Sequence, residues 1–435
     1  MKKLAQHFFL LLLFIPSITI AQSESGSELL DILSNTSEIS DITTLSNSIY
    51  PEKYELYLTN PIDWNDPNSS TFKSRIILCY KGMDYPTVIV TEGYYANYAS
   101  YPTYEEELSH LFNSNVIVCE HRYYGKSVPD SLDWHYLTVD NALADIHHAR
   151  TLFGSIFKNK WISTGISKGG QTTMFYCAKY PDDVDVSVAY VAPLNKSVED
   201  GRHEPFLANK VGTEDERKIV LSAQLELLKR KPQLLSSFQN YCQSHDYNYQ
   251  APIEDIYDYC VMELPFAFWQ WGTPIKRIPS LNDNDNEWFK FMIAISEPDY
   301  FSYPVPTTPF FVQAAYELGY YGYSLDNLSD LTSVKETHNY LRDLMLPPDA
   351  KDIEFNSNLY NTTRNYLINH DPKLIFIYGE NDPWSASGVC EWLDCSSKDN
   401  MKIFVQPKGS HTTRIRTMPN HLYKEIMSLL TKWLQ

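Results

Sequence analysis

The sequence predicts an α/β protein in which helices cover both faces of a mostly parallel β-sheet. Short runs rich in β-branched residues alternate with segments of helical periodicity, a pattern typical of parallel sheets. A serine between glycines, in "GISKG" (165–169), stands where one such run passes into a helical segment. A long segment without strand-like alternation then interrupts the series, which predicts a helical insertion rather than a long structureless loop.

The individual elements follow from these periodicities. Seven runs are predicted to be strands, in chain order Ser74–Tyr80, Thr87–Gly93, Asn115–Arg122, Lys160–Ser167, Val184–Pro193, Pro372–Glu380 and Met401–Ser410. Segments with apolar residues three and four positions apart are predicted to be helices, namely Val139–Phe153, Gly170–Tyr180, Glu214–Tyr241 and Asn420–Leu434.

The N-terminus has the features of a secretory signal. Lys2 and Lys3 precede the apolar run Phe8–Ile20. Thr19 and Ala21 then place small residues at the two positions that a signal peptidase recognises. We therefore expect residues 1–21 to be a cleaved signal peptide and the mature protein to be secreted or periplasmic. No later segment has the roughly 18 apolar residues of a membrane helix, so no membrane span is expected after cleavage.

The rest of the chain is predicted to consist of one core with an insertion. Residues 22–48 are polar and rich in Ser and Thr, which predicts a flexible leader. Residues 49–194 and 356–435 carry the strand-like runs and are expected to form the two parts of an α/β core. Residues 195–355 are expected to form a large helical cap above it.

Charge and cysteine content narrow the class further. The formal net charge of −18 argues against a nucleic-acid partner, because little in the chain would neutralise phosphates. Among seven cysteines, two pairs are close enough in sequence to form disulfides after export. These pairs are Cys242 with Cys260 and Cys390 with Cys395, whereas the stretches around Cys79, Cys119 and Cys177 predict buried thiols. No Cys/His spacing resembles a zinc site, and no metal or other cofactor is expected.

Ser167 has the sequence context of a catalytic nucleophile. A strand that passes into a helix through Gly-x-Ser-x-Gly is the nucleophile-elbow pattern of α/β-hydrolases. Such a serine needs a histidine base and an acid that orients it, in the chain order Ser, acid, His and at the ends of later strands. Asp382 and His411 follow the last two predicted strands, so Ser167, Asp382 and His411 are the predicted triad. Glu380 is the rival acid, although it lies closer to its strand.

Two backbone amides are the predicted donors to a developing oxyanion. One is the Lys168 N–H, at the start of the helix after the nucleophile, and the other is the Tyr94 N–H, in the loop after the strand Thr87–Gly93. Glu92 in this loop would oppose a negative charge, so it is expected to face elsewhere, toward a cationic part of the substrate or as a capping or Arg-paired residue. The Glu120-His121-Arg122 segment is predicted to make structural ion pairs.

Six segments are familiar when taken together: "TEGYY", "EHRYYGKS", "GISKGG", "FVQAAYELGYYGY", "GENDPWSASG" and "KGSHTTR". They resemble the secreted tripeptidyl aminopeptidase family of serine peptidases, which is similar to the prolyl carboxypeptidase and dipeptidyl peptidase II group. The resemblance runs from about Tyr50 to the C-terminus. It implies an α/β-hydrolase fold with a helical cap, exopeptidase action at N-termini and the same triad. Lys168 favours the tripeptidyl branch, but the length of the released peptide does not follow.

The insertion is acidic and aromatic. Residues 251–330 hold twelve Asp and Glu against three Lys and Arg. Such a cap would suit peptides that carry a free ammonium, and its rings would pack against apolar side chains, including proline. Glu92 and Glu317 are the candidate ammonium anchors, and Trp269 and Trp271 are candidate binding residues. A solvated acidic surface is the alternative for any one of these carboxylates.

The predicted function is therefore a secreted serine exopeptidase that releases short peptides, chiefly tripeptides and including those with proline, from free N-termini through an acyl-enzyme. A dipeptidyl peptidase or a prolyl carboxypeptidase-like enzyme is the alternative within the same chemistry. A non-catalytic peptide-binding protein of the same fold is the alternative from another class.

Overall fold

The computed structural model describes residues 27–435. The predicted signal peptide, residues 1–21, lies outside them. The chain forms two compact units, Met1–Ser37 and Glu38–Gln435. In the described part of the first, the Ser27 side chain accepts from the Leu30 amide and so caps helix α1 (Glu28–Ser34). Among the described residues, no helix is both long and apolar enough to cross a membrane.

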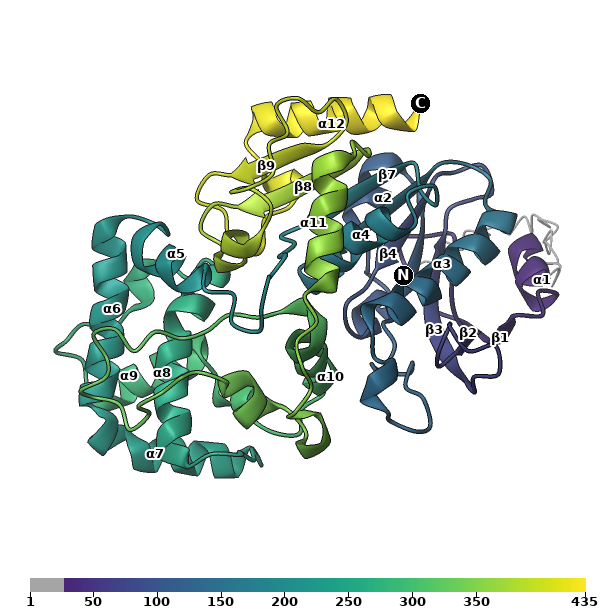
Figure 1. Ribbon diagram of the computed structural model, residues 1–435. Coiled ribbons are helices and arrows are strands. Elements are labelled where there is room, and N and C mark those ends of the chain that lie inside the picture. Colours follow the sequence, from purple (N-terminus) through teal and green to yellow (C-terminus); the bar gives the residue numbers. More distant parts are fainter. Residues whose placement is uncertain (1–26) are drawn as a thin grey trace, which may run out of the picture. The chain divides into compact units, whose positions relative to one another are not determined.

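The second unit is built on a nine-stranded sheet of order β1-β2-β3-β5-β4-β6-β7-β8-β9 (Figure 1). The strands are β1 (Ile39–Thr44), β2 (Glu52–Pro61), β3 (Thr71–Tyr80), β4 (Thr87–Thr91), β5 (Asn115–Cys119), β6 (Trp161–Ile166), β7 (Val186–Tyr190), β8 (Leu374–Gly379) and β9 (Lys402–Gln406). Strands β1, β2, β3 and β5 pair antiparallel, and every pair from β5 to β9 is parallel. The predicted α/β-hydrolase fold is confirmed, and each of the seven predicted strands is present.

Helices cover both faces of this sheet. Alternate strand residues such as Val88 and Val90 share one apolar cluster with Leu108, Ile426 and Leu430. Helices α2 (Glu107–Phe112) and α12 (Asn420–Leu434) therefore cover that face. Helices α3 (Val139–Ile156), α4 (Lys168–Lys179) and α11 (Asn358–Asn369) pack together on the other.

Residues 22–48 were predicted to form a flexible leader, and this prediction is wrong for residues 27–48, which the structure describes. Residues Ile39–Thr44 form strand β1, which pairs antiparallel with β2. The backbone beyond it is also held, since the Leu45 amide donates to the Lys53 carbonyl at 2.8 Å. The segment is polar because β1 is an edge strand and buries none of its side chains fully. Its composition therefore reflects an exposed sheet edge.

The insertion contains helices joined by loops, and the longest of these loops covers residues 319–337. Between β7 and α11 lie α5 (His203–Asn209), α6 (Glu214–Lys229), α7 (Lys231–Ser244), α8 (Ile253–Gln270), α9 (Asp285–Ile295) and α10 (Thr308–Gln313), with shorter helical turns between them. Figure 1 shows α6, α7, α8 and α9 gathered apart from the strands. The predicted helix Glu214–Tyr241 is two helices. The first ends before Arg230, where the chain turns, and the second begins at Lys231 with Pro232 in its first turn.

The proposed disulfides are not formed. All seven cysteines, which lie within the described residues, are free thiols. Cys242 on α7 instead accepts a hydrogen bond from the Tyr249 hydroxyl at 3.1 Å. Cys79, Cys119 and Cys177 are buried, as predicted.

Candidate active site

Ser167 occupies a sharp turn between β6 and α4. Its backbone has φ 58° and ψ −120°, a left-handed conformation that is strained for a residue with a side chain. The Ser167 amide donates to the Tyr190 carbonyl of the neighbouring strand at 2.9 Å, which holds the turn in place. Among the described residues the Ser167 hydroxyl has no hydrogen-bond partner, and it lines three cavities.

Glycines make room for this turn at two points of close approach. A methyl group added at Gly165 would lie 2.2 Å from the Gly169 carbonyl oxygen. One added at Gly93, in the loop after β4, would lie 2.7 Å from Lys168 Cβ and 2.9 Å from the Gly169 amide. Gly165 therefore lets the nucleophile turn fold back closely on itself, and Gly93 lets the β4 loop touch this turn.

Replacing Gly165 with alanine is expected to displace the turn. The added methyl would meet backbone atoms, which cannot move aside as a flexible side chain can. We expect the free energy of unfolding to fall by about 1–3 kcal/mol and labelling of Ser167 by a fluorophosphonate to slow. Chemical denaturation and labelling kinetics would measure both. Unchanged stability with full labelling would show that the close approach is not required.

Asp382 and His411 lie in contact above the sheet edge. Asp382 follows β8 and is buried, with Oδ1 accepting from the Trp384 amide at 3.2 Å. Its Oδ2 is 2.7 Å from His411 Nδ1. His411 follows β9, and its amide donates to the Gln270 carbonyl at the end of α8, at 2.9 Å. An imidazole held in this way keeps a proton on Nδ1 and leaves Nε2 as the free base.

Ser167 and His411 line one cavity of about 600 Å³. The rival acid Glu380 is turned away from it, because its Oε2 accepts from the Lys408 amide at 2.7 Å in an exposed loop. The structure therefore places Asp382, and not Glu380, against the imidazole.

Of the two predicted oxyanion donors, one amide has no acceptor within its helix and the other is already hydrogen-bonded to a carboxylate. Lys168 is the first residue of α4, so its amide has no acceptor within the helix. The Tyr94 amide donates to Glu92 Oε1 at 3.3 Å, and the Gly93 amide donates to the same oxygen at 2.9 Å. Glu92 thus curls back over its own loop, where the Tyr98 hydroxyl donates to Oε2 at 2.5 Å. The Tyr94 amide becomes available to substrate only when this carboxylate moves.

The Lys168 side chain joins the nucleophile turn to this loop. It is buried, and Nζ donates to the Gly93 carbonyl at 2.5 Å. The ammonium lies 5.4 Å and 5.3 Å from the ring centroids of Tyr94 and Tyr124. Burial lowers the pKa of Lys168 to about 7, and the nearby Glu92 carboxylate opposes that shift. No pattern in the sequence would have indicated this contact.

The predicted binding residues divide into two groups. Trp271 lines the cavity that holds His411, with ring centroids 5.9 Å apart, and Glu92 lines it too. Glu317 and Trp269 line none of the cavities that Ser167 lines, so the structure does not bring them to the predicted site. Glu317 accepts from the Val139 amide at 2.6 Å, where the positive end of α3 favours a carboxylate. Trp269 is buried in the apolar core of the insertion.

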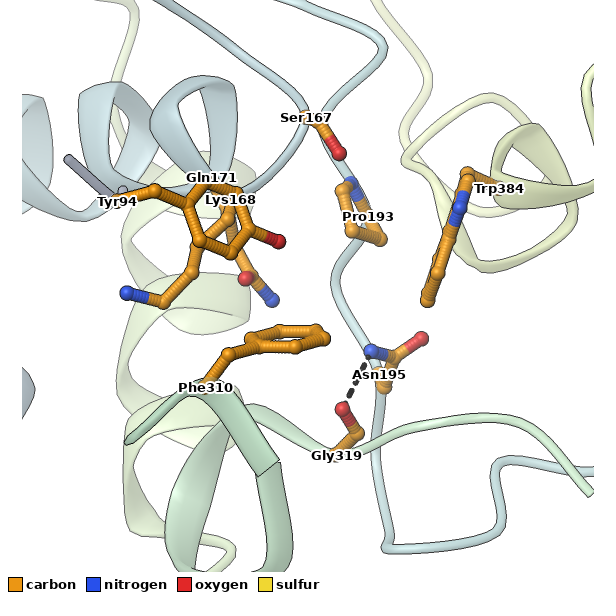
Figure 2. Close-up of a pocket in the computed structure, with 9 residues that line it drawn as sticks. All are labelled: Tyr94, Ser167, Lys168, Gln171, Pro193, Asn195, Phe310, Gly319 and Trp384. Carbon is orange, nitrogen blue, oxygen red and sulfur yellow. Dashed lines mark hydrogen bonds between the residues drawn. The ribbon is translucent and has the colours of Figure 1, made fainter. Parts of the chain in front are cut away.

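A cavity of about 310 Å³ connects Ser167 with the insertion. Its wall includes the carboxylates Glu263, Glu297 and Asp299 and a set of rings contributed by Tyr94, Trp271, Tyr300, Phe310, Phe311, Tyr320, Tyr321 and Trp384. Figure 2 shows the rings of Tyr94, Phe310 and Trp384 around the space that the Ser167 hydroxyl faces. The acidic, aromatic composition of residues 251–330 was the signal for this wall, but it did not single out these residues.

The Glu120-His121-Arg122 segment is structural, as predicted. Arg122 makes a bidentate ion pair with Asp145, with distances of 2.7 and 2.8 Å. Glu120 accepts from Arg75 at 3.1 Å and from the Ala96 amide at 2.9 Å, which anchors the loop that carries Tyr94. Within residues 27–435, no group of three or more His, Cys, Asp or Glu side chains is placed to hold a metal ion.

Three carboxyl groups should make stability depend on pH. Burial raises the pKa of Glu263 to about 8 and those of Glu106 and Glu317 to about 7, from ordinary values of 4.5. Between these limits the three carboxyl groups hold more protons in the folded chain than in the unfolded chain, so their contribution to the free energy of unfolding should fall as pH rises. Burial lowers the pKa of His203 to about 4 and that of His121 well below 6.5, so these two groups oppose the trend below about pH 6.5, and Lys168 opposes it above about pH 7.

Chemical denaturation between about pH 5 and pH 7 would measure this trend. The Glu263→Gln variant should lose less stability over this interval than the wild type, because one of the three groups no longer titrates. A Glu263→Gln variant whose free energy of unfolding changes with pH as much as that of the wild type would contradict the prediction.

Comparison with known proteins agrees with this geometry. The sequence matches the PS-10 peptidase S37 family over residues 29–418. The chain belongs to this family. The resemblance found in the sequence is thereby confirmed, and the protein is a peptidase. A prolyl tri/tetrapeptidyl aminopeptidase of Streptomyces mobaraensis is 25% identical over 383 residues, which cover 86% of this chain and 78% of that one.

Solved structures similar to this peptidase are more distant. A proline iminopeptidase of Mycobacterium smegmatis has a TM-score of 0.40 and 11% identity, over 87% of this chain and 98% of that one. An esterase of Pyrococcus furiosus has a TM-score of 0.39 and 10% identity, over 91% of this chain and all of that one (100%).

Proposed function

We propose that this S37 peptidase is a secreted serine exopeptidase that releases short peptides, chiefly tripeptides and including those with proline, from free N-termini through an acyl-enzyme. One observation carries the proposal. Ser167, in a strained turn at a helix N-terminus, and His411, bonded to Asp382, open onto the same cavity. The signal-like N-terminal segment supports secretion.

In the proposed mechanism, His411 Nε2 takes the proton of the Ser167 hydroxyl while the oxygen attacks the scissile carbonyl. Asp382 keeps the imidazole oriented and stabilises it when charged. The Lys168 amide donates to the oxyanion, and the Tyr94 amide joins it once Glu92 releases it. His411 then gives the proton to the leaving amine, and water cleaves the acyl-enzyme by the same route. The hydrogen bond between Ser167 and His411 forms as substrate binds.

The two larger cavities support an exopeptidase. The cavity of about 310 Å³ carries carboxylates and rings that suit the ammonium and apolar side chains of a short N-terminal peptide. The cavity of about 600 Å³ leaves room for the remainder of the substrate chain. The Streptomyces mobaraensis relative is named for prolyl tri/tetrapeptidyl aminopeptidase activity, which favours the tripeptidyl alternative over the dipeptidyl one.

A panel of chromogenic amides tests this function. Ala-Ala-Pro and Ala-Pro p-nitroanilides would be compared with and without N-acetylation, alongside fluorophosphonate labelling of the wild type. We expect labelling at Ser167 and preferred cleavage of the free-amine tripeptide. Labelling without a preference for free amines would contradict the exopeptidase proposal. Absence of labelling and hydrolysis would favour a peptide-binding protein.

A further inference from the structure

We infer that Glu263 on helix α8 binds the N-terminal ammonium of the substrate, and that its position along α8 sets the released peptide at three residues. This inference rests on the proposed exopeptidase function and names the group that would recognise the free N-terminus. It replaces Glu317, which the structure removes from the cavity.

Glu263 is a buried carboxyl with one oxygen left for a ligand. It is 6% exposed and lines the cavity of about 310 Å³. Its Oε2 accepts from the hydroxyls of Tyr321 and Tyr323, at 2.9 and 2.8 Å. Its Oε1 accepts no hydrogen bond from the described residues and is not sealed within the protein. The tyrosines thus fix the carboxylate while one oxygen stays open to the cavity.

The cavity lacks a cation of its own. Among the described residues that line it, none is Lys, Arg or His, and Glu263 forms no ion pair there. A buried carboxylate without a positive partner is costly, and burial accordingly raises the pKa of Glu263 to about 8. A primary ammonium would supply both the missing charge and a donor for Oε1. The surrounding rings would add cation–π attraction.

The other two carboxylates of this wall are less suited to the same role. Glu297 and Asp299 are exposed, so water screens their charge. Glu297 Oε1 is already occupied by the hydroxyls of Tyr241 and Tyr247, at 2.8 and 3.0 Å. These two groups would attract a cation toward the cavity, whereas Glu263 would hold it there.

Helix α8 sets the spacing between Glu263 and the residues that contact His411. Glu263, Ala267, Gln270 and Trp271 all line the cavity and follow one face of the helix, at i, i+4, i+7 and i+8. Gln270 accepts from the His411 amide, and the Trp271 ring meets the His411 ring. Seven residues of α-helix rise by roughly 10 Å. Three residues of extended peptide span at most about 10–11 Å, so the anchor matches a tripeptide.

The test compares Glu263→Gln with Glu254→Gln, a matched change in an exposed carboxylate of the same helix that lines none of the cavities Ser167 lines. Substrates are Ala-Ala-Pro p-nitroanilide with a free N-terminus, its N-acetyl form, and p-nitrophenyl acetate, which has no amine. For Glu263→Gln we expect kcat/KM on the free-amine peptide to fall about 10- to 100-fold, with ester hydrolysis and fluorophosphonate labelling unchanged. Glu254→Gln should keep the wild-type activity on the free amine.

The outcomes separate this inference from the proposed function. If Glu263→Gln keeps the wild-type preference for the free amine, the anchor assignment is wrong although the exopeptidase stands. If the variant loses amide, ester and labelling reactions equally, Glu263 is structural. If the wild type itself does not prefer free amines, both proposals fail. Should Glu263→Gln not fold, Tyr323→Phe removes one donor to Oε2 and should lower the free-amine kcat/KM selectively but less.

The length assignment has its own test. In the double variant Glu263→Gln with Ala267→Glu, the carboxylate moves one helical turn, roughly 6 Å, toward His411. The preferred product should shorten by one or two residues, which mass spectrometry of products from an unblocked peptide would reveal. Continued release of tripeptides by an active double variant would overturn the link between α8 and cut length.

Discussion

Replacing Ser167 with alanine is expected to lower kcat by about a millionfold and to abolish fluorophosphonate labelling. The reason is that the hydroxyl is the group that attacks, while the Asp382–His411 pair and the turn should remain as they are. Stability should not fall, because the Ser167 hydroxyl has no hydrogen-bond partner in the described chain and its backbone is strained.

Steady-state hydrolysis of Ala-Ala-Pro p-nitroanilide and thermal unfolding would measure these effects. Ser385→Ala is the matched control, since this hydroxyl donates only to the Gly379 carbonyl at 2.8 Å and should be dispensable for labelling. Hydrolysis or labelling that survives in the Ser167 variant would assign the chemistry to another residue.

Replacing Asp382 with asparagine is expected to lower kcat by roughly 10⁴-fold, with KM little changed. The amide can still accept from the Trp384 amide through Oδ1, so the local turn should persist. However, the nitrogen that replaces Oδ2 would face His411 Nδ1 and favour the tautomer with its proton on Nε2. That imidazole cannot accept the serine proton.

The pH profile of kcat and the stability of the same variant would distinguish catalysis from structure. Glu380→Gln is the control, because Glu380 bonds to the Lys408 amide and not to His411. A fall in activity for Glu380→Gln as large as that for Asp382→Asn would contradict the assignment of the acid.

Sequence reasoning succeeded where a local pattern carries the information. The seven core strands are short apolar runs, and β-branched residues buried on both faces of a parallel sheet leave a clear signal. Strands β1 and β2 have no comparable apolar run, and the sequence analysis did not predict them. Lys53 in β2 reads as a surface residue, yet it is buried and its ammonium donates to the Tyr101 carbonyl at 2.8 Å. Its partner is 48 positions away and cannot be inferred from the strand itself.

For the site too, the sequence identified the residues that a local pattern marks and missed those that depend on distant contacts. Gly-x-Ser-x-Gly, an acid after one strand and a histidine after the next are fixed by chain order and strand ends, so the sequence alone could nominate Ser167, Asp382 and His411. It could also identify residues 251–330 as acidic and aromatic. It could not distinguish Glu263 from Glu317, because each lies in a helical segment among tyrosines.

By itself the sequence determined the α/β core, the peptidase family and the residues nominated for the chemistry, because those depend on local periodicity and short motifs. Only the tertiary structure decided which carboxylate lines a cavity together with Ser167. Glu317 turns toward the amide of Val139, Glu92 bonds back to its own loop, and Glu263 lines the cavity of about 310 Å³ that Ser167 also lines. The reason is physical: a carboxylate's role depends on which donors reach it, and those donors come from helices and loops distant in the chain.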